Sequence, residues 1–130
     1  MHELSITQAL YDLTLDEANG LGANRVTALT VQVGALTAID PSAVVFYFET
    51  MSKGSCAEGA LIHFDKVMPT ARCQNCHHEM PIPTSATNGS AGFNYAWLQD
   101  YNQMVCENCG HQRFELVGGH EFALLSLEIE

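Results

Sequence analysis

Cys73-Gln74-Asn75-Cys76 and Cys106-Glu107-Asn108-Cys109 are the two stretches that decide how this chain folds. Each is a C-x-x-C pair, which curls one short turn around a metal ion so that both sulfurs point inward. Together the pairs supply four thiolates in a tetrahedral arrangement, the shell that structural zinc prefers. A redox-active C-x-x-C instead stands once, at the start of a helix in a βαβ unit, so duplication favours a metal. The spacing therefore predicts a structural zinc ion bound by Cys73, Cys76, Cys106 and Cys109.

The cysteine pairs lie in a segment, from about Pro69 to Gly119, whose composition differs from that of the rest of the chain. It holds three of the four prolines and four of the five cysteines, and its apolar residues are too irregular to build a core alone. We therefore expect a bound metal to hold this segment together. The gap of 29 residues between Cys76 and Cys106 exceeds the about 15 to 20 of typical zinc-ribbon patterns. The segment therefore carries an insertion, in which residues 84–92 have the composition of a loop.

Aromatic residues follow this loop and precede the second cysteine pair. We expect them to pack against the metal-binding segment as a small core, and a partner-binding surface is the alternative. These residues, together with one leucine among them, are Phe93, Tyr95, Trp97, Leu98 and Tyr101.

Two histidines, His77 and His111, stand beside the cysteine pairs. Replacement of a thiolate by either imidazole stays open, although surface residues beside a complete four-sulfur site are favoured. Cys56 has no partner at ligand spacing, and we expect it to be a packed small residue.

The remaining sequence has the periodicities of a small α/β unit. Ser5 and Gln8 form an S-x-x-Q capping box, which predicts a helix over residues 5–19. A second helix is predicted from Pro41, after an N-cap at Asp40, to Gly54. Strands are predicted at residues 29–33, 60–67 and 122–129, the last with Leu125, Leu127 and Ile129 on one face.

These elements predict an α+β fold, with a small mixed three-stranded sheet, two helices and an inserted four-cysteine zinc-ribbon-like domain. Residues 1–68 and 120–130 are expected to form a discontinuous α/β domain that binds nickel for the reasons below. Residues 69–119 are expected to form the zinc-binding domain with its long inserted loop.

The chain is strongly acidic, with 15 Asp and Glu residues, five Lys and Arg residues and a formal charge of −10. The five cations are scattered, which makes nucleic acid a poor partner. Such a surface suits a cation carrier or a basic protein partner, although ordinary solubility is the simpler explanation. No apolar run is long enough to span a membrane and no secretory signal is readable, so we expect a cytoplasmic protein without a membrane partner.

The N-terminal Met1-His2 offers a second kind of metal site. The free amine of Met1, the deprotonated backbone nitrogen of His2 and its ring nitrogen can bind one ion in two fused chelate rings. Three coplanar nitrogens suit square-planar nickel(II) or copper(II) rather than tetrahedral zinc. The fourth position is open to Glu3, to another protein nitrogen or to a ligand of an acceptor protein, and this permits transfer by ligand exchange. An exposed histidine without function is the alternative.

As a set, these residues resemble the HypA/HybF family, the nickel-incorporation metallochaperones of [NiFe]-hydrogenase maturation. The resemblance rests on the two C-x-x-C pairs and on the stretches Met1-His2-Glu3-Leu4-Ser5, Val31-Gln32-Val33-Gly34, Lys53-Gly54 and Ala57-Glu58-Gly59-Ala60. It implies nickel bound through His2 in an N-terminal α/β domain, zinc held by the four cysteines, and no catalytic turnover. It also implies a nickel-handling GTPase and the hydrogenase large subunit as partners, and a homodimer is left open.

Two other classes compete with a nickel chaperone. The first is a zinc-ribbon adaptor that binds another protein without delivering metal. The second, a metal-dependent enzyme, is weaker, because four thiolates saturate a zinc ion and leave no position for an activated water. The sequence also contains no H-E-x-x-H, Gly-rich phosphate cradle or nucleophile elbow. Supply of urease in place of hydrogenase stays open.

Overall fold

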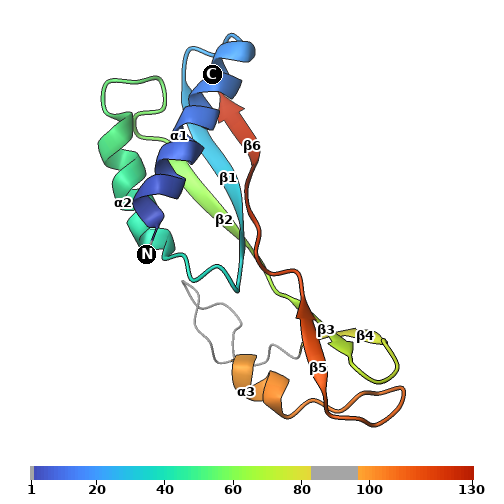
Figure 1. Cartoon of the computed structure of the whole chain (residues 1–130). Coiled ribbons are helices and arrows are strands. Elements are labelled where there is room, and N and C mark those ends of the chain that lie inside the picture. Colours follow the sequence, from blue (N-terminus) through green and yellow to red (C-terminus); the bar gives the residue numbers. More distant parts are fainter. Residues whose placement is uncertain (1, 83–96) are drawn as a thin grey trace.

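The computed structural model describes residues 2–82 and 97–130, and these form two three-stranded sheets (Figure 1). The elements are α1 (Glu3–Gly20), β1 (Val26–Gly34), α2 (Pro41–Ser52), β2 (Leu61–Val67), β3 (Thr70–Cys73), β4 (Glu79–Pro81), α3 (Trp97–Asn102), β5 (Phe114–Val117) and β6 (Phe122–Ile129). The first sheet has the order β2-β1-β6, with β2 parallel and β6 antiparallel to β1. The predicted α+β class and mixed sheet are therefore confirmed. Within the described ranges no helix has the length and apolar character needed to cross a membrane.

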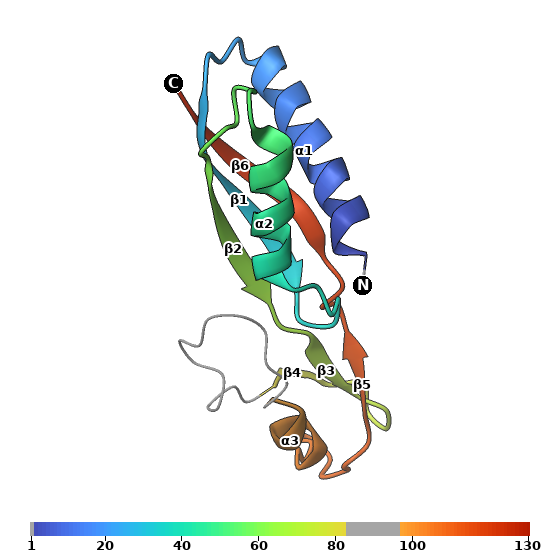
Figure 2. The same cartoon turned by 90° about the vertical axis from the view of Figure 1, so that its left-hand side faces the viewer.

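We call α1, α2, β1, β2 and β6 the α/β part, and the remaining elements the cysteine part. In the α/β part both helices lie over one face of the sheet (Figure 2). The central strand β1 has the predicted two-residue period, since Leu29, Val31 and Val33 are buried and the polar residues between them are half-buried. Phe48 of α2 and Leu10 of α1 complete this core. The predicted limits at residues 68/69 and 119/120 stay a prediction, because two sheets alone do not show that the two parts fold independently.

The first helix begins earlier than its sequence indicated. The residue before α1 is His2, whose side chain makes no capping hydrogen bond, and Ser5 lies inside the first turn. The predicted capping box was therefore wrong. A tertiary contact replaces it: Glu3 is 8% exposed as a residue, and its carboxylate accepts a hydrogen bond from the Asp40 N–H at 3.2 Å. This contact joins the start of α1 to the residue that precedes α2.

The second helix begins as predicted. Asp40 is its N-cap, and its carboxylate accepts from the Ser42 N–H at 3.0 Å, which satisfies one of the free donors of the first turn. Pro41 occupies the first helical position, where its missing N–H costs no hydrogen bond. Val44 and Phe48 then face the sheet, four residues apart on one side of the helix.

The closing strand β6 departs from the predicted alternation. β1 pairs with Ser126 and then with Leu124, so Leu125 has no partner in the ladder. Such a bulge moves the following side chains to the opposite face. Leu124 and Leu127 consequently pack against the core, whereas Leu125 is 49% exposed. Ile129, the last residue of β6, is 40% exposed. The prediction that Leu125, Leu127 and Ile129 share one face was wrong for Leu125.

The cysteine part has its own sheet and core. Its strands have the order β4-β3-β5, all antiparallel, and α3 was not predicted. Trp97 is fully buried, and its ring lies 6.4 Å from that of Tyr101 at an angle of 64°. The prediction of an aromatic mini-core is therefore confirmed for these two residues. Phe93, Tyr95 and residues 84–92 lie outside the described residues.

The two parts meet where backbone segments pass very close to one another. The Gly34 N–H donates to the Glu121 carbonyl at 2.7 Å, and the Leu36 N–H donates to the Gly119 carbonyl at 2.7 Å. A Cβ atom at Gly34 would lie 2.1 Å from the Gly119 oxygen, so this approach requires glycine. Leu36 also packs against the core of the cysteine part, which couples the end of β1 to that core.

Candidate metal centre

The four paired cysteines come together at the ends of β3 and β5 that lie far from the larger sheet. Their sulfur atoms all lie within 4.8 Å of one another. The Sγ atoms of Cys73 and Cys109 are 3.5 Å apart and those of Cys76 and Cys106 are 3.6 Å apart, so the close pairs cross between the two stretches. All four cysteines are free of disulfides. A tetrahedral shell with zinc–sulfur bonds of about 2.3 Å requires sulfur separations of about 3.8 Å, and this donor set fits such an ion.

Both C-x-x-C stretches adopt the same turn. The Cys73 N–H donates to the His78 carbonyl at 2.9 Å and the His77 N–H donates to the Cys73 carbonyl at 2.9 Å. In the second copy, Cys106 N–H donates to the carbonyl of residue 111 at 2.8 Å and Gly110 N–H donates to the Cys106 carbonyl at 2.9 Å. His77 and Gly110 both have a left-handed backbone, with φ of 65° and 78°. The position that suits glycine is thus occupied by histidine in the first turn.

Local hydrogen bonds favour the thiolate form at two of the sulfurs. The backbone N–H of His111 and neighbouring amides lower the pKa of Cys109 to about 5. The Asn108 side chain, 3.4 Å from the Cys76 sulfur, lowers the pKa of Cys76. Burial raises the pKa of Cys106. N–H groups directed at sulfur stabilise the charged form, which is the form that ligates a metal.

The histidines beside the cluster have roles that the sequence interpretation assigned incompletely. His77 shapes the first turn through its backbone. His111 contacts the cluster, with Nδ1 3.4 Å from the Cys109 sulfur. His78, which sequence reasoning did not single out here, is the positional equivalent of His111 and pairs with Glu107 across the two turns at 2.9 Å. This equivalence could have been predicted from the sequence, because in each copy a histidine stands two residues after the second cysteine. Within the described part of the chain, no further group of His, Cys, Asp and Glu residues is close enough to hold a metal.

The predicted nickel ligands lie in the other part of the molecule. The start of α1 lies beside the start of α2, in the α/β part (Figure 1). His2 is exposed at the N-cap position, and Glu3 is buried against Asp40. Met1 lies outside the described residues. The structure thus brings the four sulfurs together and keeps His2 apart from them. Cys56 is half-buried against the core of the α/β part, as predicted.

Comparison with known proteins identifies the family. Residues 1–129 match the family described as "Hydrogenase/urease nickel incorporation, metallochaperone, hypA". Hydrogenase maturation factor HypA of Aeromonas salmonicida is 30% identical over 129 residues, with 99% of each chain covered. The factor of the same name from Methanosarcina mazei is 33% identical over 130 residues, which cover all of this chain and 93% of that one.

Solved structures agree with this assignment. The solution structure of the Ni metallochaperone HypA from Helicobacter pylori superposes with a TM-score of 0.59 at 25% identity, covering 99% of this chain and 97% of that one. A second solution structure of a HypA protein gives a TM-score of 0.64 at 27% identity, with coverage of 100% and 97%. The four-cysteine metal site, the mixed sheet and these matches lead to one conclusion. The chain belongs to the HypA family of nickel-incorporation metallochaperones.

Proposed function

We propose that this chain carries Ni(II) on its N-terminus and delivers it to the large subunit of a [NiFe]-hydrogenase in the cytoplasm, in concert with a nickel-handling GTPase. Zinc bound by Cys73, Cys76, Cys106 and Cys109 has a structural role and holds the cysteine part together. The protein is a carrier rather than an enzyme, and a homodimer is compatible with this function. The family description, which names nickel incorporation and covers residues 1–129, supports the proposal.

The observation that carries the nickel proposal is the placement of His2. Its side chain is exposed and forms no capping bond with α1. As the N-cap residue it has a backbone N–H without an acceptor inside the helix. Neither the imidazole nor this N–H bonds to another residue in ranges 2–82 and 97–130, so both nitrogens can turn toward one ion without breaking α1. With the Met1 amine they supply the three coplanar nitrogens that planar Ni(II) prefers.

Glu3 is the proposed fourth nickel ligand from this end of the chain, and its environment constrains that role. The carboxylate is buried and accepts from the Asp40 N–H. Ligation therefore requires Glu3 to share this contact with the ion or to leave it. A Glu3→Gln variant separates the two roles: it keeps a hydrogen-bond acceptor for Asp40 but removes the anionic ligand.

The zinc proposal is supported by the chemistry of the donor set. Four sulfurs at near-tetrahedral separations match the closed shell of a structural zinc site, which contributes directly to folding. The bound ion supplies a fixed cross-link between the two C-x-x-C turns. These turns in turn set the relative positions of β3, α3 and β5.

The experiment that tests nickel carriage is a titration of untagged, zinc-loaded protein with Ni(II). Binding is measured by calorimetry, and the geometry of the bound ion by its absorption spectrum. Wild type should retain one zinc and bind a further planar Ni(II). His2→Ala, or acetylation of the Met1 amine, should abolish this binding without loss of zinc. His63→Ala is the matched control, because His63 is an exposed histidine on β2, away from both sites. Equal nickel uptake by the His2→Ala and wild-type proteins would refute the proposal.

Delivery needs a second assay, because binding alone fits a storage role. Nickel-loaded protein is mixed with metal-free hydrogenase large subunit, with the GTPase and without it, and nickel in the re-isolated subunit is measured. The same assay with metal-free urease distinguishes the two enzymes that the family description names. A zinc-ribbon adaptor that binds partners without delivering metal would bring no nickel to either enzyme and would be indifferent to His2→Ala.

A further inference from the structure

The cysteine part contains a polar pocket that neither metal site uses. Its volume is about 290 Å³, and it lies between the end of α3, the start of β5 and the first C-x-x-C turn. The lining residues are Gln74, Tyr101, Asn102, Gln112, Arg113 and Phe114. They include one cation, three amide side chains and two aromatic rings, and no carboxylate.

The cation of this pocket, Arg113, has no counter-ion in the described part of the chain. Arg113 forms no ion pair with any residue in the described ranges, although the chain carries a formal charge of −10. Arg72, on the neighbouring strand, shows the contrast: its guanidinium lies 3.1 Å from Glu79 and 3.6 Å from Glu115. In a protein with three acidic residues for each basic one, an exposed arginine that lines a pocket and pairs with no described residue is available for an anion from outside.

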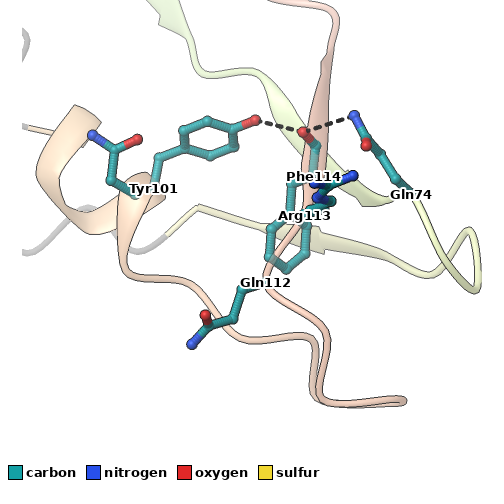
Figure 3. Close-up of a pocket in the computed structure, with 6 residues that line it drawn as sticks. Gln74, Tyr101, Gln112, Arg113 and Phe114 are labelled. Carbon is teal, nitrogen blue, oxygen red and sulfur yellow. Dashed lines mark hydrogen bonds between the residues drawn. The ribbon is translucent and has the colours of Figure 1, made fainter.

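The walls of the pocket are held in place by specific contacts. The Tyr101 hydroxyl donates to the Phe114 carbonyl at 3.0 Å, and the Gln74 amide donates to the same oxygen at 3.4 Å. Figure 3 shows these two side chains reaching that carbonyl from opposite sides. The Gln74 backbone N–H also donates to the Arg113 carbonyl at 2.9 Å. Because Gln74 belongs to the first C-x-x-C turn, the turn that contributes two of the four sulfurs also forms one wall of the pocket.

The chemistry of the lining selects a carboxylate among anions. A guanidinium offers two parallel N–H donors that match the two oxygens of a planar carboxylate, and amide N–H groups can add to them. The same two donors also match a phosphate, so the discrimination rests on charge. One arginine balances a carboxylate monoanion but leaves a phosphate dianion with a net negative charge, and the next arginine, Arg72, is already paired with two glutamates. The net charge of the chain also disfavours a polyanion such as nucleic acid.

The size and walls of the cavity favour a carboxylate that belongs to a polypeptide. A volume of about 290 Å³ exceeds that of a lone carboxylate, and the rings of Tyr101 and Phe114 offer an apolar surface for a neighbouring backbone. We propose that this pocket is a docking site for an Asp or Glu side chain of a partner protein, with Arg113 as its anchor. The site is separate from His2 and does not depend on nickel.

The test is an NMR titration of the full-length, zinc-loaded chain with short blocked peptides. Ac-Gly-Glu-Gly-NH2 is the probe, Ac-Gly-Gln-Gly-NH2 is its uncharged match, and acetate and inorganic phosphate are the free anions. The readouts are the side-chain N–H signals of Arg113 and Gln74. Fluorescence of Trp97, the single tryptophan, reports independently, since its ring contacts Tyr101.

The glutamate peptide should shift the Arg113 and Gln74 signals and bind at least about tenfold more tightly than each of the other three ligands. The glutamine peptide lacks the charged bidentate pair with Arg113. Acetate and phosphate can form such a pair, but they lack the peptide backbone that would pack against the rings of Tyr101 and Phe114. Arg113→Gln should weaken the glutamate peptide to the level of the glutamine peptide. Arg25→Gln is the matched control, because Arg25 is also exposed and unpaired among the described residues, but lies in a cleft of the α/β part. Equal binding of both peptides, equal binding of acetate or tighter binding of phosphate would overturn the proposal. It would also be overturned if Arg113→Gln had no effect, or only the effect of Arg25→Gln.

Discussion

Substitution of Gly34 by alanine should disrupt the junction between the two parts of the molecule. A Cβ atom there would lie 2.1 Å from the Gly119 oxygen, 2.2 Å from the Gly119 carbonyl carbon and 2.7 Å from the Glu121 nitrogen. All three are backbone atoms, so no side chain can rotate away. The chain before β6 would have to move by about 1 Å to restore ordinary contact distances.

The loss in the free energy of unfolding can be estimated from the interactions that this movement would break. The hydrogen bonds from Gly34 to Glu121 and from Leu36 to Gly119, both 2.7 Å, span this contact. Each contributes about 0.5 to 1.5 kcal/mol net, and forced overpacking costs about 1 to 3 kcal/mol. Gly34→Ala should therefore lower the free energy of unfolding by about 2 to 6 kcal/mol, a large share of the roughly 5 to 15 kcal/mol of a typical domain.

The assay is urea unfolding of the zinc-loaded protein, followed by far-ultraviolet circular dichroism. Gly20→Ala is the control, because Gly20 is the last residue of α1 and a Cβ there would meet no atom within 4 Å. This control should leave stability unchanged or raise it slightly, since alanine favours the helix. A loss below about 1 kcal/mol in Gly34→Ala would refute the reasoning about the junction.

Three further predictions concern the cysteine part. Cys106→Ser should release the zinc and unfold the cysteine part while the α/β part stays folded, as measured by metal analysis and amide hydrogen exchange; uniform protection in the variant would contradict it. When a chelator removes zinc at pH 7 in the presence of iodoacetamide, the thiols are exposed to the reagent before the cysteine part unfolds. Cys109, whose pKa in the folded protein is lowered to about 5 by the N–H of residue 111, should then react before Cys106, whose pKa is raised by burial. Mass spectrometry of the modified peptides gives the order, and faster modification of Cys106 would contradict it. His77 and Gly110 both have positive φ, which glycine tolerates better than other residues. His77→Gly should therefore stabilise the zinc-loaded protein by up to about 1 kcal/mol, and Gly110→Ala should destabilise it by about 1 to 2 kcal/mol. Melting temperatures of both variants equal to that of the wild type would contradict this.

Local patterns in the sequence were sufficient to predict the four-cysteine cluster and most helices and strands of the α/β part. Two C-x-x-C pairs predict four converging thiolates, because the ion itself imposes their geometry. The alternation in β1 and the Asp40-Pro41 cap of α2 were readable for a similar reason, since each depends on residues only a few positions apart. The HypA family assignment was also reached from such short stretches, and the whole-chain comparisons confirm it.

The errors lie where distant segments determine local structure. α1 begins before Ser5 because the buried Glu3 carboxylate bonds to the Asp40 N–H, 37 residues away. Leu125 leaves the ladder because the pairing of β6 with the central strand β1 shifts by one residue between Thr30 and Val31. Neither the Glu3–Asp40 hydrogen bond nor the shift at Leu125 could be predicted from the residues next to it in the sequence.

The sequence by itself determined which chemical groups this protein can offer: four cysteine thiols in two C-x-x-C pairs, the His2 imidazole that we propose as a nickel ligand, and an excess of acidic residues. Only the tertiary structure decided which groups meet. It closed the Gly34–Gly119 junction, paired His78 with Glu107 across the two turns, and placed Arg113 at a pocket without an ion pair to any described residue. The physical reason is that ligand type and periodicity are properties of short segments, whereas close backbone approaches and pockets arise from packing between segments far apart in the chain.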